Sequence, residues 1–333
     1  MASTIVAGDV GGTKIHLAVY RADAGGLVML DDRRYPTREC ASLEAALANF
    51  LHGDDTVAAA CFGIPGPVID GVGRPVNIPW EMREESITHA LEGAPTRLLN
   101  DLEATAWGTL HLEDGEITTL QAGRPPRNPA NVVVIAAGTG LGEAGMVRTT
   151  AGWHVVASEG GHADFAPRGA EQELLLRFLE REFDHVSFER LVSGPGLHNI
   201  YRFLLSRSAE PEPEWLAARI RSDDPSVVIG EAGIKQQEPR CARALEIFAA
   251  IYGAEAAHLA LKYLALGGVY VCGGIAPKIL PVLRGGGFIR AFLDKGRLRA
   301  TLEQIPVQVS LNEDTALIGA ANFAAAMVRA ARG

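Results

Sequence analysis

The sequence predicts an α/β protein made of two similarly organised halves. Apolar strands and helical stretches occur in both halves of the 333-residue chain. A strand, a glycine-rich turn and a second strand span residues 4–20, and the same unit returns over residues 131–148. The length suits two lobes better than one. We therefore expect a structural duplication rather than an array of short repeats.

The first half opens with a β-hairpin, in which GDVGGTK joins the apolar runs Thr4–Ala7 and Ile15–Tyr20. Helical spacing of apolar residues predicts a helix over 41–51. Apolar runs predict strands over 57–62 and 96–99, and a helix follows the second of them from Leu102.

In the second half, a strand over 131–136 ends in AAGTGLG and continues into a hairpin partner over 143–147. The later elements are helices and strands in mixed order. We expect helices over 171–182, 241–264 and 315–331, and strands over 268–274 and 305–310.

Composition limits the classes of function. Hydrophobic residues make up 47% of the chain and charged residues 21%, as in an ordinary globular protein. The formal charge of −9 argues against broad binding to nucleic acid or to anionic membranes, which both need a positive surface. The start MASTIVAGD has no signal-peptide pattern, and the apolar stretch over 256–276 is too interrupted for a membrane span.

The cysteines give no metal motif. None of the four forms a C-x-x-C pair, and we expect reduced thiols of a cytosolic protein at Cys40, Cys61, Cys241 and Cys272.

The first glycine turn is a candidate phosphate site. Adjacent glycines let backbone N–H groups approach an anion, and Thr13 adds a hydroxyl. Asp9 would repel a bare phosphate, so its place there makes sense if a divalent metal or its waters lie between them. The segment is not a Walker loop, because Ile15 follows Lys14 and no second glycine precedes it at the required spacing. The alternative is a simple tight hairpin.

Two further glycine turns follow strands. Gly138, Thr139 and Gly140 lie in a turn that matches the first one in position, and such a pair suits a triphosphate held between two lobes. Gly273 and Gly274 come between a strand and an expected helix capped by Pro277, where a purine or a sugar ring could approach the backbone. Close packing of strand and helix is the alternative.

Asn100 and Asp101 end a strand just before a helix. Asp101 there is either a helix cap or a general base, since substrates of open α/β folds bind beyond the carboxyl ends of strands. A helix N-terminus would keep the carboxylate ionised, and such a base suits the loose transition state of phosphoryl transfer.

The segment SEGGHADF, residues 158–165, is polar and glycine-rich. Its spacing does not match a zinc site, whereas Glu159 and His162 could bind the vicinal hydroxyls of a sugar. Asn77 and Trp80 could supply an amide and an apolar wall, and Glu189 another hydroxyl acceptor. Each of these also has an ordinary structural interpretation.

In this order, the segments resemble the bacterial glucokinase family, within the sugar kinase, Hsp70 and actin superfamily. GDVGGT and AAGTGLG look like its two phosphate motifs, CGGIAP like its adenosine motif, and LLND like the strand that carries the base. EGGHADFAP and ERLVSGPGL resemble its sugar-binding turn and the segment after it, and these two are the more specific. The resemblance covers nearly the whole chain.

The resemblance implies a duplicated ribonuclease-H-like, actin-like ATPase fold with two lobes around a cleft. The small lobe would comprise residues 1–109 and 316–333, and the large lobe 110–315. The implied reaction is transfer of phosphate from ATP to the 6-hydroxyl of glucose, giving glucose 6-phosphate and ADP, in a cytoplasmic homodimer. Asp101 would be the base, Asp9 would act on Mg²⁺ through water, and the sugar would bind Asn77, Asn100, Asp101, Glu159, His162 and Glu189. The nucleotide would bind Gly8, Asp9, Val10, Gly11, Gly12, Thr13, Gly138, Thr139, Gly140, Gly273 and Gly274.

Some positions depart from the family pattern. Ser158 stands where glycine is frequent, and Lys14 where asparagine is frequent. The zinc motif of a related kinase branch is not matched, so we expect no structural zinc.

Other functions remain as alternatives. A kinase for another hexose or an N-acetylhexosamine would differ only in pocket shape. A sugar-responsive regulator would need a DNA-binding module, whereas the first strand begins within a few residues of the start. An actin-like or chaperone ATPase would share the glycine turns but has no use for EGGHADF.

Overall fold

The computed structural model describes residues 2–23, 25–52, 56–75, 78–124, 126–150 and 152–331. Two compact units comprise Met1–Glu113 with Asn312–Gly333, and Asp114–Leu311. The sequence placed the boundaries at 109/110 and 315/316, a few residues away. That these units act as lobes of one cleft stays a prediction.

The first unit contains a mixed sheet of five described strands in the order β3-β2-β1-β4-β8. A small sheet of three short strands, β5, β6 and β7, lies in the same unit. The strands are β1 Ser3–Val10, β2 Lys14–Asp23, β3 Gly26–Pro36, β4 Val57–Ile64, β5 Val68–Ile69, β6 Val72–Gly73, β7 Met82–Arg83 and β8 Thr96–Asn100. The helices are α1 Leu43–Phe50, α2 Glu84–Ala90, α3 Asp101–Thr109 and α12 Thr315–Ala330.

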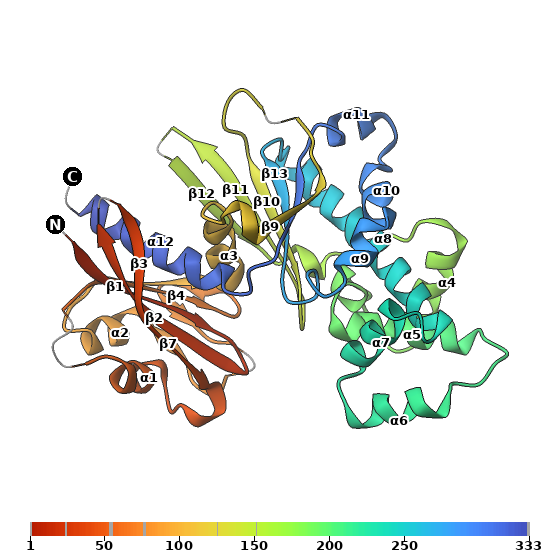
Figure 1. Cartoon of the computed structure of the whole chain (residues 1–333), viewed down its shortest axis with the longest axis horizontal. Coiled ribbons are helices and arrows are strands. Elements are labelled where there is room, and N and C mark those ends of the chain that lie inside the picture. Colours follow the sequence, from red (N-terminus) through yellow and green to blue (C-terminus); the bar gives the residue numbers. More distant parts are fainter. Residues whose placement is uncertain are drawn as a thin grey trace. The chain divides into compact units, whose positions relative to one another are not determined.

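Helices cover both faces of the five-stranded sheet. Val6 and Val10 of β1 pack in one core with residues of α1 and α2, whereas Ile5 and Ala7 pack in another with α3 and α12. Successive side chains of a strand point to opposite faces, so a strand buried on both sides is apolar throughout. Figure 1 shows α12, from the end of the chain, running along this sheet.

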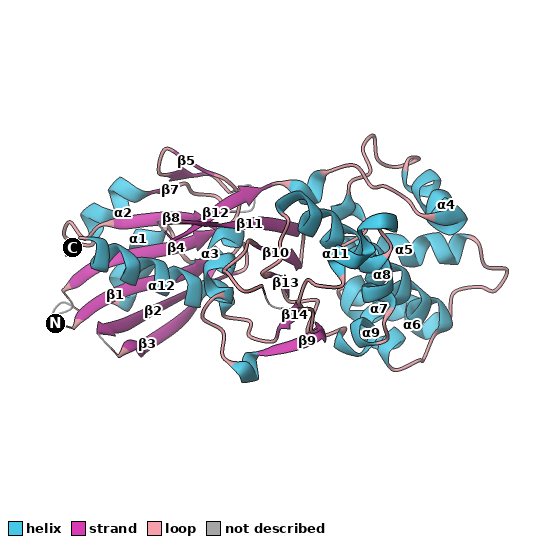
Figure 2. Cartoon of the chain, turned by 90° about the horizontal axis from the view of Figure 1, so that it is seen from above, coloured by secondary structure: helices cyan, strands magenta, loops and turns pink. Residues whose placement is uncertain are grey.

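The second unit contains a sheet of six described strands in the order β12-β11-β10-β13-β14-β9. Helix α8 packs on this sheet and lies among the other helices of the unit (Figure 2). The strands are β9 Ile117–Gln121, β10 Val132–Ala137, β11 Leu141–Thr149, β12 Gly152–Ser158, β13 Gly268–Cys272 and β14 Val307–Ser310. The helices are α4 Gly169–Leu179, α5 Gly194–Ser206, α6 Glu214–Ser222, α7 Pro225–Ile234, α8 Pro239–Tyr263, α9 Leu280–Arg284, α10 Gly287–Leu293 and α11 Arg299–Leu302.

The two sheets share one pairing pattern, which confirms the predicted duplication. In the first unit, β1 pairs antiparallel with β2 and parallel with β4. In the second, β10 pairs antiparallel with β11 and parallel with β13. Each hairpin adds a third antiparallel strand outside, β3 or β12, and each parallel strand adds a second, β8 or β14.

The strands and helices expected from the sequence are confirmed to within a few residues, but one detail was wrong. Residues 273–279 form bends and turns, and the next helix begins at Leu280 rather than at Pro277.

Helix α8 is long and apolar enough to span a bilayer by length and composition alone. Its most apolar stretch is 78% buried within the structure, as in the core helix of a globular unit.

The contact between α3 and α12 depends on glycine. A Cβ on Gly319 would overlap the carbonyl oxygen of Ala104, and one on Gly108 would overlap that of Thr315. We therefore expect Gly319→Ala to lower the free energy of unfolding of the first unit by about 1–3 kcal/mol, through overpacking. Chemical denaturation measures this change.

Gly230→Ala provides the matched control for that experiment. Gly230 also lies in a helix, α7, but a Cβ there would have no neighbour within 4 Å. The substitution should be neutral or stabilise by up to about 1 kcal/mol, because alanine is the better helix former. Equal losses in both variants would contradict the packing argument.

Candidate active site

The first glycine turn is fastened to the end of β3. The backbone N–H of Gly11 donates to the carbonyl oxygen of Lys14 at 2.8 Å. The hydroxyl of Thr37 donates to the carbonyl oxygen of Gly11 at 2.7 Å, and its N–H donates to that of Thr13 at 3.0 Å. Gly8 is needed for packing, since a Cβ there would stand 2.6 Å from the Phe62 ring. These contacts hold the turn in one shape, as a phosphate-binding backbone requires.

Asp9 lies on β1 directly opposite His16 of β2. Burial raises the pKa of its carboxyl, the charges of Lys14 and His16 oppose this rise, and that of Asp314 adds to it. Mg²⁺ keeps several of its waters and takes few carboxylates besides phosphate oxygens. One such carboxylate beside a glycine turn fits a metal held through water, and Asp9 is the residue that would hold those waters.

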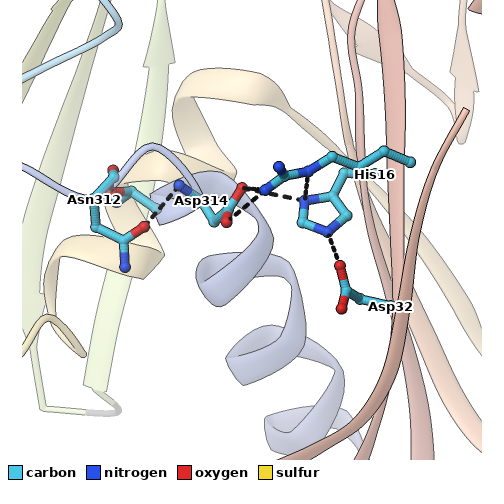
Figure 3. Close-up of polar contacts among 6 residues, drawn as sticks. His16, Asp32, Asn312 and Asp314 are labelled. Atoms are coloured by element: carbon cyan, nitrogen blue, oxygen red, sulfur yellow. Dashed lines mark hydrogen bonds and ion pairs between the residues drawn. The ribbon is translucent and has the colours of Figure 1, made fainter. Parts of the chain in front are cut away.

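His16, which stands opposite Asp9 in the pairing of β1 with β2, anchors the start of α12 (Figure 3). Its imidazole is 2% exposed, with Nε2 at 2.8 Å from Asp32 Oδ2 and Nδ1 at 3.1 Å from Asp314 Oδ1. The backbone N–H of Asp314 donates to Asn312 Oδ1 at 2.7 Å, and Arg34 Nη2 donates to both Asp314 oxygens. Sequence reasoning missed this cluster. Its signal was a histidine within the buried stretch of β2, residues 15–20, whose other side chains are apolar or aromatic.

Asn100, not Asp101, caps helix α3. The Asn100 Oδ1 accepts from the N–H of Leu102 at 2.8 Å, and the N–H of Asn100 donates to Glu103 Oε2 at 2.9 Å, which completes a capping box. Asn100 Nδ2 also donates to the carbonyl oxygen of Gly66 at 3.1 Å. The alternative interpretation of Asp101 as the cap is therefore wrong.

Asp101 is the first residue of α3, where the helix dipole favours an ionised carboxylate. Its Oδ1 accepts from the N–H of Leu102 at 2.9 Å. Gly63 of β4 lies under this helix end, since a Cβ there would stand 2.9 Å from that of Ala104 and 3.9 Å from the Cα of Asp101. The carboxylate therefore stands at the carboxyl end of β8, as the sequence predicted.

In the second unit, Glu189 joins two of the predicted segments. It lies in the short 3-10 helix Phe188–Arg190. Its Oε2 accepts from the backbone N–H of Leu141 at 2.9 Å, and its Oε1 is 3.9 Å from His162 Nδ1. A Cβ on Gly140 would stand 2.5 Å from the same carboxylate. The second phosphate turn and the predicted sugar turn thus share one side chain.

The predicted sugar turn is a 3-10 turn, Gly160–His162, that follows β12. The Ser158 hydroxyl accepts from the N–H of Gly160 at 2.9 Å, so this departure from the family pattern supports the turn. Glu159 and His162 are exposed. Asp164 is exposed as well, and its carboxylate lies 2.8 Å from His185 Nε2.

A cavity of about 350 Å³ opens beside this turn. Its lining is mainly charged and polar and includes two predicted sugar-binding residues. It is formed by His162, Glu182, Phe183, Asp184, His185, Ser187, Glu189 and Arg190. A larger cavity of about 850 Å³, among α7, α8, α9 and α10, contains none of the predicted site residues. The charged and polar lining, rather than the volume, therefore favours the smaller cavity as the candidate site.

The other two glycine turns lie at the ends of the neighbouring parallel strands β10 and β13. Gly273 has φ +84°, and a Cβ there would overlap the carbonyl oxygen of Ala137, which brings the two turns together. At Gly138 and Gly274, in contrast, a Cβ would meet no atom within 4 Å. The backbone is thus open there to a ligand.

Two predicted residues have no demonstrated place in the site. Asn77 lies outside the described residues. Trp80 packs against the first unit's core, and its indole N–H donates to the carbonyl oxygen of Cys40 at 3.1 Å. Among the residues that the structure describes, no group of three or more His, Cys, Asp and Glu could hold a metal ion. The four cysteines are free thiols.

Glu189→Ala tests the link between the two turns. It would leave the buried N–H of Leu141 without its acceptor, so we expect the free energy of unfolding to fall by about 1–3 kcal/mol. Glu182→Ala is the control, because that side chain lines the same cavity but makes only an exposed ion pair with Arg202. Its loss should stay below about 1 kcal/mol. If denaturation curves show that Glu182→Ala lowers the free energy of unfolding as much as Glu189→Ala does, the structural role of Glu189 is contradicted.

Solved structures share this fold. A glucokinase from an Antarctic psychrotroph superposes with a TM-score of 0.85 at 28% identity, covering 97% of this chain and 98% of the other. A glucokinase from Balamuthia mandrillaris in complex with glucose gives 0.79 at 21% identity, covering 100% and 94%. A ROK family glucokinase from Streptomyces griseus in complex with glucose and AMPPNP gives 0.63 at 24%, covering 96% and 99%. These likenesses confirm the predicted duplicated, actin-like ATPase fold.

Sequence comparison agrees along nearly the whole chain. The glucokinase of Nostoc punctiforme is 38% identical over 338 residues, covering 96% of this chain and 98% of the relative. That of Synechocystis is 37% identical over 352 residues, covering 98% and 99%. The family model described as Glucokinase matches residues 6–327. The chain therefore belongs to the glucokinase family.

Proposed function

We propose that this chain transfers the γ-phosphoryl group of ATP to the 6-hydroxyl of glucose, with Asp101 as the general base. Membership of the family supports the ATP-dependent phosphorylation of glucose. The observation that carries the residue assignment is the place of Asp101, on the first residue of a helix at the carboxyl end of β8. Ligands of open α/β sheets bind beyond such strand ends.

The role of Asp101 follows from the loose transition state of phosphoryl transfer. The base mainly orients the attacking hydroxyl and takes its proton late, so a weakly basic carboxylate suffices. Capping by Asn100 fixes the first turn of α3 and thereby the backbone that carries this carboxylate.

Carboxylates, amides and one imidazole would bind the hydroxyls of the sugar. Glu159 and His162 are exposed on their turn, and Glu189 holds that turn to the second glycine turn. A carboxylate can accept two vicinal hydroxyls at once, and imidazole can donate or accept. The full set is Asn77, Asn100, Asp101, Glu159, His162 and Glu189.

ATP would bind the glycine turns, residues 8–13, 138–140 and 273–274. The open backbone at Gly138 and Gly274 supports this assignment. Mg²⁺ bound with ATP would neutralise phosphate charge, and Asp9 would hold its waters. A cytoplasmic homodimer remains part of the proposal, and sedimentation at several concentrations tests the dimer.

Asp101→Ala should lower kcat by about 10²–10⁴-fold, since it removes the group that accepts the hydroxyl proton. A coupled assay of ADP release with glucose and Mg-ATP measures this. Glu85→Gln, an exposed acid in the first turn of α2, is the control and should keep the original kcat. Similar turnover in Asp101→Ala, with the fold intact, would contradict its assignment as base.

The same assay with other sugars tests the substrate. Glucose should give the highest kcat/KM in a panel that includes other hexoses and N-acetylglucosamine. Higher kcat/KM with an N-acetyl sugar, or no sugar-dependent ADP release, would contradict the proposal.

Asp9→Asn should raise the KM for Mg-ATP, and the Mg²⁺ concentration needed for half-maximal rate, by about tenfold or more, with a smaller change in the KM for glucose. The physical reason is loss of the charge that holds the metal's waters. Asp23→Asn, at the far end of the same hairpin, is the control. A larger effect on glucose than on Mg-ATP would contradict this role.

A further inference from the structure

Two buried carboxyl groups lie beneath the predicted sugar turn. Glu143 of β11 is 1% exposed, and Glu255 of α8 is 0% exposed. Glu143 stands opposite Ser158, the residue whose hydroxyl supports the turn. Its Oε2 lies so close to Gly160 that a Cβ on this glycine would overlap it. The carboxyl of Glu143 therefore lies directly against the turn at Gly160.

The two carboxyls need one proton between them. Both oxygens of Glu143 and Oε1 of Glu255 are buried with no donor in the described part of the chain. Glu255 acts on Glu143 from α8, the helix that packs against β11, and two ionised carboxylates at such a buried place would repel each other. Burial first, and then the neighbouring Glu255, raise the pKa of Glu143 to about 8.

The hydrogen bonds around Glu255 indicate which of the two holds the proton. Lys295 Nζ lies 3.0 Å from His258 Nε2, and His258 Nδ1 lies 2.8 Å from Glu255 Oε2. Lysine can only donate, so Nε2 accepts and Nδ1–H donates to Glu255. Glu255 Oε2 therefore has a donor, whereas neither oxygen of Glu143 has one among the described residues, so we assign the proton to Glu143.

Other titratable groups face the pair from the same elements and from neighbouring ones. Lys262 Nζ is 4.0 Å from Glu255 Oε1 and lowers the pKa of Glu143. Glu143 in turn contributes to the raised pKa of two tyrosines of α8, Tyr252 and Tyr263. Burial lowers the pKa of Lys295, which also faces Arg168 and Asp294. The His258 ring packs edge-on against Phe188, next to Glu189, at 5.7 Å between centroids.

We propose that Glu143 is a positioning residue for sugar binding, which holds the turn of Glu159 and His162 in place only while it is protonated beside Glu255. When Glu143 ionises, its charge and that of Glu255 repel each other in the buried interior. Strand β11 and helix α8 are packed in the core, whereas the turn above is exposed at Glu159 and His162. The turn is therefore the part that yields, and sugar affinity falls. This inference rests on the proposed role of Glu159 and His162.

The same ionisation affects folding. The folded chain holds a proton on Glu143 from its ordinary pKa of 4.5 up to about 8, whereas the unfolded chain has released it. Folding stability from this group is therefore full below pH 4.5, declines as the pH rises above it, and is lost above about pH 8.

Glu143→Gln tests the proposal, because glutamine has the shape of the protonated acid and cannot ionise. In the unchanged protein, the dissociation constant for glucose should rise about tenfold between pH 7 and pH 9, as the competent fraction falls. In Glu143→Gln it should stay constant over this range. Titration calorimetry with glucose alone measures both. The dissociation constant for Mg-ATP should show no comparable rise in either protein.

Glu246→Gln is the matched control. It makes the same change on helix α8, but its side chain is 61% exposed and pairs with Arg243. This variant should keep the alkaline loss of glucose affinity. The proposal would be overturned if the dissociation constant for glucose rose as much in Glu143→Gln as in the unchanged protein. It would also be overturned if this constant did not change with pH in Glu246→Gln.

Thermal melts without glucose separate the pair from the sugar site. Tm of Glu143→Gln relative to the unchanged protein should increase from pH 6 to pH 9. If it does so while glucose affinity keeps its pH dependence, Glu143 is protonated but does not position the turn, and the proposal fails. If Glu159→Gln leaves glucose affinity unchanged, the sugar-site assignment fails instead. Should Glu143→Gln not fold, Glu255→Gln must show the same pH-independent glucose affinity.

Discussion

The carboxylate of Glu189 joins the two loops of the second unit on which its proposed chemistry depends. One oxygen accepts from the backbone of the second glycine turn, and the other faces the imidazole of the sugar turn. Glycine at position 140 leaves room for this contact, and glycine at 161 lets the sugar turn approach the backbone of Leu141. One carboxylate thus contacts both the turn after β10 and the turn after β12.

In the first unit, a capped helix holds the predicted base in place. Asn100 completes the capping box of α3, and Asp101 follows it on the first turn. Close contact between glycines and backbone fixes this helix against β4 and against α12. His16 and Arg34 then hold the start of α12 through Asp314. The predicted base and the first glycine turn therefore stand on elements whose ends are tied by polar contacts.

Two carboxyl groups near the predicted site segments have environments that disfavour a charge. Asp9 and Glu143 both have a raised pKa, and burial is the largest cause in each. The two carboxyls differ in the neighbouring charges that act on their pKa. Asp9 has Lys14 and His16 beside it, which favour the ionised form that a metal site needs. Glu143 has Glu255 beside it, which favours the protonated form. The two carboxyls thus differ in the charge state that their neighbours favour.

The sequence by itself determined the duplicated α/β organisation and the segments of the site, because apolar periodicity and glycine turns are local signals. It also placed Asp101 at a strand end, since strand and helix meet there in the chain. Only the tertiary structure decided that Asn100 is the cap, that Glu189 contacts Leu141, and that Glu143 meets Glu255, 112 positions further along the chain. Such pairs depend on strand register and on which face of a helix meets the sheet. A carboxylate's partner and its pKa follow from that packing, which no local pattern of residues specifies.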